Sequence, residues 1–377
     1  MRVDPPRRPA EVPPLARGAL VLGFLYLFLV GIAFLEAGIA AAGEGFQRGL
    51  LNSVSHPISG LCAGLLATVL VQSSSVTTAT IVGMVGAGTL PVSLAVPMVM
   101  GANIGTTITN TLASLASLRR TTEFRLAFAA ATVHDFFNIF AVALLLPIEL
   151  ATGALSGSAG WLSDRLRGTE LSGGTPSPSM LRVAVKLPVD WVSDWLTPGT
   201  AMSLILLAAG LALIFLALTF ITSNMRRLVA GSVERVMNRL IGEGGGLLGI
   251  AVGIGVTVAV QSSSITTSIL VPLVASGILT VRSAYPVTLG ANVGTTITAL
   301  IASLAVARPE GLTIALVHFL FNAVALAVIY PVPRIRMVPV QLAELMADVA
   351  TRRRTVLVVY VVGLFLALPL LGVFLIE

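Results

Sequence analysis

Residues 71–78 read Val-Gln-Ser-Ser-Ser-Val-Thr-Thr, and residues 260–267 repeat the phrase as Val-Gln-Ser-Ser-Ser-Ile-Thr-Thr. A second phrase follows each copy. Residues 101–109 read Gly-Ala-Asn-Ile-Gly-Thr-Thr-Ile-Thr, and residues 290–298 read Gly-Ala-Asn-Val-Gly-Thr-Thr-Ile-Thr. Both phrases recur after the same interval of 189 positions, from 72 to 261 and from 101 to 290. Two phrases kept in one register indicate an internal duplication.

The composition around these phrases is that of a membrane protein. The chain of 377 residues is 56% hydrophobic and 11% charged, and its mean hydropathy is +0.96. Soluble proteins are about a quarter charged. The apolar runs are long and continuous, which excludes a β-barrel with alternating strands. We expect membrane helices within residues 20–35, 126–146, 201–220 and 356–376.

The net charge of +6 comes from arginines that cluster at the ends of apolar runs. Such clusters occur at 119–125, 226–239, 334–336 and 352–354. This is the pattern of cytoplasmic loops rather than of a nucleic-acid surface, so no nucleic-acid partner is expected. We place the N-terminus in the cytoplasm and the protein in the plasma (inner) membrane. Residues 152–199 have balanced charges and all three tryptophans, and are expected outside.

The charge pattern, followed along the chain, starts the second copy on the opposite side of the membrane from the first. The fold class predicted is therefore an all-α polytopic membrane protein with two inverted-topology repeats, re-entrant helical hairpins and broken helices. Its expected parts are a cytoplasmic N-terminal tail (1–17), repeat 1 (18–150), an extracellular or periplasmic loop (151–200), repeat 2 (201–330), a cytoplasmic amphipathic segment (331–354) and an extra C-terminal transmembrane helix (355–377).

Each Gln-Ser-Ser-Ser phrase lies between two apolar runs that are too short to span a membrane. This predicts hairpins whose non-helical tips line a cavity, with the two tips facing each other near the midplane. The glycines at 101–105 and 290–294 predict breaks within helices. Four half-helix N-termini would then point at one anion site. A single Ser-Ser-Ser more often joins helices, but four phrases in register favour a ligand site.

The phrases carry hydroxyls, carboxamides and backbone N–H groups but no Arg or Lys. Such donors suit the oxygens of a phosphate dianion, and a neutral cage would need cations to enter with the anion, which is a mechanism for symport. The expected phosphate ligands are Gln72, Ser73, Ser74, Ser75, Gln261, Ser262, Ser263, Ser264, Thr107 and Thr296.

Hydroxyl and carboxamide oxygens are also hard ligands suited to Na⁺. The expected sodium ligands are Ser75, Thr78, Asn103, Thr106, Asp135, Asn138, Ser264, Thr267, Asn292, Thr295 and Asn322. No other metal and no cofactor are expected beyond the transported ions, and the lipid bilayer is the expected surrounding.

Asp135 lies inside an apolar run, where an acid is costly and usually functional. The second copy has Phe319 at this position, so the copies differ there. We expect Asp135 and Asn138 to bind a cation; the alternative is an acid at the membrane interface. The paired His134 and His318 are expected to be buried neutral imidazoles, and a proton-sensing role stays open.

At these phrases the chain resembles the type II sodium-dependent phosphate cotransporter family. The likeness extends over residues 131–138, Ala-Thr-Val-His-Asp-Phe-Phe-Asn, and over 285–296 and 318–322. It implies Na⁺-driven phosphate uptake by alternating access, with both Gln-Ser-Ser-Ser phrases holding phosphate and part of the sodium shell. It also implies that Asp135 marks electrogenic transport with an extra sodium ion. A homodimer is left open.

The chain departs from animal members in a short outer loop without cysteine. Some bacterial members carry a PhoU-like domain, which is not expected here. The loop and the preference for Arg suggest a prokaryotic protein. A symporter of sulfate or arsenate, and an uncoupled phosphate channel or exporter, remain alternatives. No Ser/His/Asp order, Walker sequence or metal-ligand spacing is found, so an enzyme is not expected.

Overall fold

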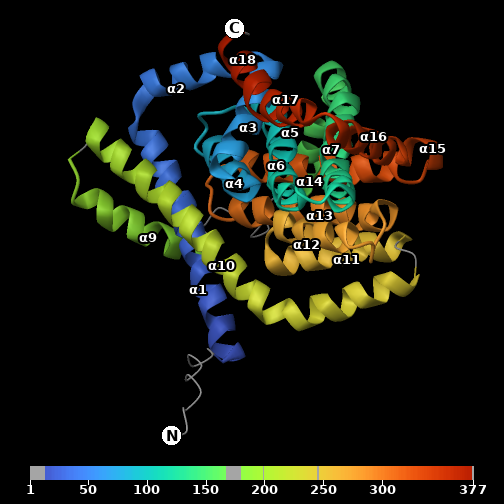
Figure 1. Cartoon of the computed structure of the whole chain (residues 1–377). Coiled ribbons are helices and arrows are strands. Elements are labelled where there is room, and N and C mark those ends of the chain that lie inside the picture. The colour runs from blue at the N-terminus through green and yellow to red at the C-terminus, as the bar shows by residue number, and fades with distance from the viewer. Residues whose placement is uncertain (1–12, 167–179, 198, 244–245, 376–377) are drawn as a thin grey trace, which may run out of the picture.

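The computed structural model describes residues 13–166, 180–197, 199–243 and 246–375, and in that part the regular elements are all helical (Figure 1). Most of the predicted N-terminal tail and residues 167–179 of the predicted outer loop lie outside the described residues. The first sequence copy contains α1 (Pro14–Ala41), α2 (Gly43–Ser53), α3 (Pro57–Val71), α4 (Ser74–Gly86), α5 (Val92–Gly105), α6 (Ile108–Ser114), the 3₁₀ turn η1 (Leu115–Ser117) and α7 (Thr121–Thr152).

Two helices, α8 (Ala154–Arg165) and α9 (Met180–Asp194), occupy much of the segment predicted as a loop. The second copy contains α10 (Thr200–Glu243), α11 (Gly246–Val260), α12 (Ser263–Ala275), α13 (Val281–Ser303) and α14 (Glu310–Ile329). The chain continues with α15 (Pro333–Arg336), α16 (Val338–Arg352), α17 (Arg354–Val362), the π-helical η2 (Gly363–Ala367) and α18 (Leu368–Leu375).

The helix lengths fit a polytopic membrane protein. Among the described residues, six helical segments are long and apolar enough to cross a membrane: 14–41, 92–117, 121–152, 200–228, 310–329 and 354–375. The arms of the predicted hairpins, α3, α4, α11 and α12, are apolar but have only 13 to 15 residues. At 1.5 Å per residue they are too short to span about 30 Å of hydrocarbon. The all-α polytopic class is confirmed.

The first helices of the two copies, α1 and α10, pack along each other in opposite directions (Figure 1). Gly31 of α1 meets Ile214, and Gly38, about two turns later, meets the earlier residue Leu207. Gly210 of α10 meets Leu35 in the same seam. Small residues let two backbones approach closely. An inverted pair requires this antiparallel arrangement of its first helices; inversion of the two whole copies stays a prediction.

The glycines of the Gly-Ala-Asn phrases serve helix packing and do not mark breaks. A Cβ at Gly101 would clash with the carbonyl of Leu61 in α3, and one at Gly290 would clash with the carbonyl of Ile250 in α11. The prediction of a break at 290–294 is wrong, since α13 is continuous there. In the first copy the chain does leave the helix, but at Thr106 and Thr107, after the glycines.

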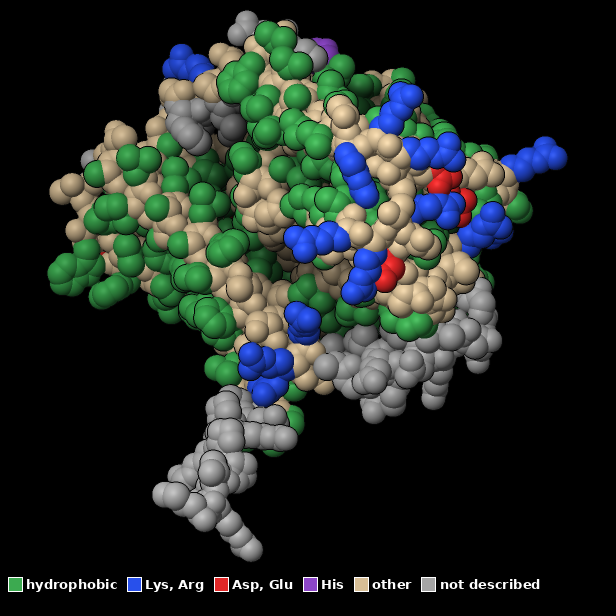
Figure 2. Space-filling model, in the orientation of Figure 1, with side chains coloured by type: hydrophobic (Ala, Val, Ile, Leu, Met, Phe, Trp, Pro, Cys, Tyr) green, Lys and Arg blue, Asp and Glu red, His purple; other side chains and the backbone are tan. Residues whose placement is uncertain are grey.

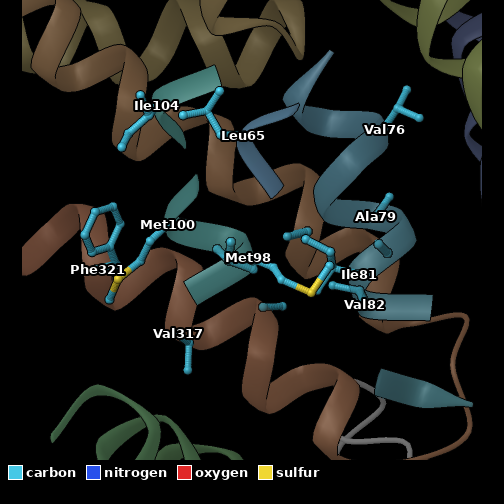
Figure 3. Close-up of a cluster of buried hydrophobic side chains, with 14 of the residues drawn as sticks. Leu65, Val76, Ala79, Ile81, Val82, Met98, Met100, Ile104, Val317 and Phe321 are labelled. Atoms are coloured by element: carbon cyan, nitrogen blue, oxygen red, sulfur yellow. The ribbon is translucent and has the colours of Figure 1, made fainter. Parts of the chain in front are cut away.

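The core is apolar and continuous between the copies. Figure 3 shows Met100 of α5 extending toward Phe321 of α14, and Met98 extending toward Ile81 of α4; all four are buried. Many of the Arg and Lys side chains in Figure 2 lie on the side of α15 and α16, and others lie at the lower end of the molecule and at its upper left. Arg125 of α7 pairs with Asp348 of α16. Below this surface, the hairpin arms pack against the longer helices: α3 against α5, α4 against α1, α11 against α13 and α12 against α7.

Candidate functional site

Each hairpin reverses direction at a glutamine in the left-handed backbone region. Gln72 follows α3 with φ 58°, and Gln261 follows α11 with φ 57°; among the described residues no other non-glycine has positive φ. The side chains hold this turn, because Nε2 donates to the carbonyl three residues earlier, at 2.6 Å to Val69 and at 2.7 Å to Val258. Such a conformation costs roughly 1–3 kcal/mol and is typical of functional positions.

The serine after each glutamine begins the second arm of its hairpin. Ser73 and Ser262 are extended, and each Oγ accepts the backbone N–H of the residue three positions on, at 3.3 Å. This is the N-cap arrangement. The other N–H groups of the first turn have no partner within their helix, so α4 and α12 each present the donors that suit an anion.

The two tips line one cavity of about 660 Å³, a volume usual for small-molecule sites. All eight hairpin residues predicted to bind phosphate, 72–75 and 261–264, are among those that line it. The predicted meeting of the tips is therefore found in the structure. The polar residues that complete the wall come from α10 and are Thr219, Thr222, Ser223, Arg226 and Arg227.

The two arginines change the electrostatics expected of the site. The Gln-Ser-Ser-Ser phrases carry no charge, but Arg226 and Arg227 bring two cations to the same cavity, so it is not the neutral cage that was predicted. Both are exposed. Polar residues of α10 at 219, 222, 223 and 226 share helical spacing near the end of an apolar run, where Asn224 and Arg227 are polar as well. This spacing in the sequence indicates a polar helix face directed toward a cavity.

Two of the predicted phosphate ligands do not line this cavity. Thr107, in the turn between α5 and α6, is fully buried and donates to the carbonyl of Ile104 at 2.8 Å. Thr296, in the continuous α13, is also fully buried and donates to the carbonyl of Val293 at 2.7 Å. Because α13 has no break, the expected arrangement of four half-helix N-termini is not found.

A buried network of asparagines and histidines joins the two copies beside the hairpins. His134 Nε2 donates to Asn292 Oδ1 at 2.6 Å, and Asn292 Nδ2 donates to Asn138 Oδ1 at 2.6 Å. One histidine and one asparagine of the first copy, one helical turn apart on α7, thus hold the asparagine of the second copy's Gly-Ala-Asn phrase.

The same arrangement recurs with the copies exchanged. His318 Nε2 donates to Asn103 Oδ1 at 3.1 Å, and Asn103 Nδ2 donates to Asn322 Oδ1 at 2.7 Å. All of these residues are at most 2% exposed. In both histidines Nδ1 has no partner. The two imidazoles are buried and hydrogen-bonded, as expected.

The predicted sodium ligands fall into two groups. Ser75 and Ser264 line the cavity, whereas the four asparagines belong to the network, where each carboxamide oxygen already accepts a hydrogen bond. The remaining hydroxyls are buried near the tips. Their bonds are from Thr78 to the carbonyl of Ser74 at 2.9 Å, from Thr106 to that of Ala102 at 3.3 Å, from Thr267 to that of Ser263 at 2.8 Å, and from Thr295 to the hydroxyl of Ser263 at 3.1 Å.

Asp135 is completely buried in α7. Its Oδ2 accepts from Thr111 at 3.1 Å and from Tyr360 at 2.7 Å, and its Oδ1 has no partner. Asn138 donates to the carbonyl of Asn103 at 2.7 Å. The two residues predicted to share a cation therefore bond to different neighbours.

Sequence reasoning also missed a contact from α6 to the second hairpin. Asn110 Nδ2 donates to Thr267 Oγ1 at 2.6 Å, and Ser268 Oγ donates to Asn110 Oδ1 at 3.1 Å. Asn110 continues the polar phrase that starts at Gly101, which was the only signal for it. Among the described residues no group of three or more His, Cys, Asp or Glu side chains could hold a metal ion.

Comparisons with known proteins identify a family for the chain. A family model described as Na⁺/Pi-cotransporter matches residues 27–153 and 202–346. Sodium-dependent phosphate transport protein 2A of Rattus norvegicus is 35% identical over 93% of this chain and 66% of its own length. Protein 2B of Homo sapiens is 32% identical over 94% of this chain and 64% of its own length. The chain thus spans about two thirds of these relatives. No solved structure matches it.

Proposed function

The chain belongs to the Na⁺/Pi-cotransporter family, whose members are transporters and not enzymes, and from that premise we propose that it carries inorganic phosphate into the cell together with Na⁺. The observation that carries the proposal is the shared cavity. Both hairpin tips, one from each sequence copy, line it beside Arg226 and Arg227.

Phosphate is bound in this cavity by hydroxyls and backbone N–H groups of the two tips. Hydrogen phosphate has several oxygens that accept hydrogen bonds. Ser hydroxyls, Gln carboxamides and the N–H groups of helix N-termini can all donate to them. The arginines of α10 supply charge-assisted hydrogen bonds, which are about twice as strong as neutral ones. When phosphate binds beside Arg226 and Arg227, oxygen atoms of the tips remain free to bind Na⁺.

Sodium binds close to the same tips, and Asp135 provides one further site. The Oδ1 of Asp135 is buried without a partner, and an unpaired buried carboxylate oxygen is costly unless a cation or proton meets it. The second copy has Phe319 at the matching position. One sodium site would therefore lack a symmetric counterpart. A Na⁺ carried there, beyond the two that balance a divalent phosphate, would make transport electrogenic.

Alternating access follows from two inverted copies whose tips share one site. The antiparallel packing of α1 and α10 supports this inversion. Arginine clusters favour a cytoplasmic N-terminus and a plasma-membrane location. Arg226 and Arg227 belong to such a cluster, so the cavity would open toward the cytoplasm in this conformation.

The purified full chain in proteoliposomes tests the proposal. Labelled phosphate uptake is measured at clamped voltage with and without an inward Na⁺ gradient, and with sulfate or arsenate as competitors. We expect uptake that requires the gradient and is displaced poorly by sulfate. Uptake that ignores the gradient would instead mean an uncoupled channel or exporter, and preference for another oxyanion would change the substrate.

Variants connect that activity to the cavity and to Asp135. The pair Ser75→Ala and Ser264→Ala should weaken phosphate transport, whereas Ser276→Ala, exposed at the end of α12, should not. Asp135→Asn should lower the charge moved per phosphate. Unchanged charge in Asp135→Asn would remove the proposed electrogenic site while leaving cotransport intact.

A further inference from the structure

The last membrane helix places a tyrosine on Asp135, a completely buried acid of α7. The Tyr360 hydroxyl donates to Asp135 Oδ2 at 2.7 Å, and Thr111 donates to the same oxygen at 3.1 Å. Oδ1 of the carboxylate is buried and has no partner. Two donors on one oxygen fix the plane of the carboxylate and leave the other oxygen for a different ligand.

The tyrosine ring is held in place by three phenylalanines. Its centroid lies 6.1 Å from that of Phe128, 6.1 Å from that of Phe136 and 6.4 Å from that of Phe365. Phe128 and Phe136 flank Asp135 on α7, whereas Phe365 belongs to the π-helical turn η2. Aromatic pairs at these separations are favourable, and single π-turns within helices occur often at functional sites.

The start of the same helix is fixed to α7 and to the turn before it. Arg354 Nη2 donates to the carbonyl of Leu118 at 3.1 Å, and its guanidinium lies 4.6 Å from the ring centre of Phe124. Tyr360 follows less than two turns after Arg354. The contacts of these two residues therefore fix the helix between them.

We propose that Tyr360, contributed by a helix outside the two sequence copies, is the residue that positions the Asp135 carboxylate to bind a transported Na⁺. The proposal rests on the sodium site at Asp135 put forward above. Tyr360 acts through Asp135 and need not touch the ion. The asymmetric sodium site is thus built from three sources: α7, the α6 segment after the helix break, and the C-terminal helix.

Tyr360→Phe removes only the hydroxyl and tests the proposal. In proteoliposomes the Na⁺ concentration for half-maximal phosphate uptake should rise by roughly tenfold, the effect of losing one hydrogen bond to a charged group. Maximal uptake at saturating Na⁺ should change much less. In an Asp135→Asn background the second substitution should have no further effect on the Na⁺ dependence, because its action passes through the carboxylate.

Two matched tyrosine variants serve as controls. Tyr285→Phe alters a buried tyrosine whose hydroxyl has no partner, and Tyr26→Phe removes a bond to the carbonyl of Ala184. Neither should change the Na⁺ dependence. A Na⁺ dependence in Tyr360→Phe equal to that of the unaltered protein, or an effect that persists in the Asp135→Asn background, would overturn the proposal.

A second measurement separates this proposal from the proposed function. Thermal stability of the detergent-purified chain is followed as Na⁺ replaces choline at constant ionic strength. The unaltered protein should be stabilised by Na⁺, and Tyr360→Phe should need more Na⁺ for the same effect. If the unaltered protein shows neither Na⁺ stabilisation nor Na⁺-driven uptake, the proposed function fails. If it shows both and Tyr360→Phe matches it, only the role of Tyr360 fails.

Discussion

His134 and Asn292 are hydrogen-bonded at 2.6 Å, and this bond joins the first sequence copy to the second. His318 and Asn103 form the reciprocal bond at 3.1 Å. Each Gly-Ala-Asn phrase therefore presents its asparagine to the other copy. The crossed bonds are buried between α5, α7, α13 and α14, the helices that pack against the hairpins, so they tie the two halves of the site together.

Removal of one carboxamide from this network should destabilise the protein. Asn103→Ala leaves the Nε2 of His318 and the Oδ1 of Asn322 without partners, and each unsatisfied buried group costs roughly 1–3 kcal/mol. Asn292→Ala should be comparably damaging, since its environment is equivalent. The check is thermal unfolding in detergent. Asn224→Ala on the surface of α10 is the control, and equal stability of Asn103→Ala and Asn224→Ala would contradict the role of the network.

Alanine at the first glycine of either Gly-Ala-Asn phrase should disrupt hairpin packing. In Gly101→Ala and Gly290→Ala the new methyl group meets a backbone carbonyl of the neighbouring helix, which cannot move like a flexible side chain. Overpacking of this kind costs about 1–3 kcal/mol. Gly255→Ala, on the open face of α11, should instead be neutral or slightly stabilising. Stability and expression of the three variants decide the matter, and tolerance of both buried alanines would refute close packing.

The strained glutamine at each tip should separate stability from function. Gln72→Gly and Gln72→Ala both remove the side chain from the cavity, but only glycine adopts φ near 58° without strain. We expect both variants to lose phosphate transport, with Gln72→Gly the more stable by about 1 kcal/mol. Uptake assays and thermal unfolding test this together. Full transport by Gln72→Gly would show that the side chain has no part in the site.

The arginines of α10 should raise the affinity for phosphate. Arg226→Gln and Arg227→Gln each remove a cation from the cavity, and loss of one hydrogen bond to a charged group corresponds to roughly tenfold or more in affinity. Half-saturation for phosphate should therefore shift upward, with less change in maximal uptake. Arg334→Gln, exposed on α15, is the charge-matched control. The same shift in all three variants would point to a general surface potential instead.

The sequence was sufficient for the hairpins because their signals are local. A polar Gln-Ser pair between two short apolar runs leaves the chain few ways to satisfy its backbone except by turning at that point. It was insufficient for the Gly-Ala-Asn phrases. Glycine suits both a helix break and a close helix contact, and only the neighbouring carbonyls of Leu61 and Ile250 show that close contact is its role.

The cavity residues divide in the same way. The eight residues of the Gln-Ser-Ser-Ser phrases were found from the repeated sequence, and the structure brings them to one cavity. Arg226 and Arg227 were assigned only to a cytoplasmic loop, because their approach to the tips depends on how α10 crosses the hairpins. Thr107 and Thr296 belong to the Gly-Ala-Asn phrases. Each donates to a backbone carbonyl three residues earlier and does not line the cavity.

The sequence by itself determined a duplicated helical membrane protein with two polar hairpin tips and one asymmetric acid, since repetition, hydropathy and a lone charge can be read without contacts. Only the tertiary structure decided which side chains meet: His134 with Asn292, Arg226 with the tips, and Tyr360 with Asp135. The physical reason is separation along the chain. His134 and Asn292 lie 158 positions apart, Asp135 and Tyr360 lie 225 apart, and Arg226 is 35 positions from the nearer tip. Local pattern carries no information on how separate helices are oriented against each other.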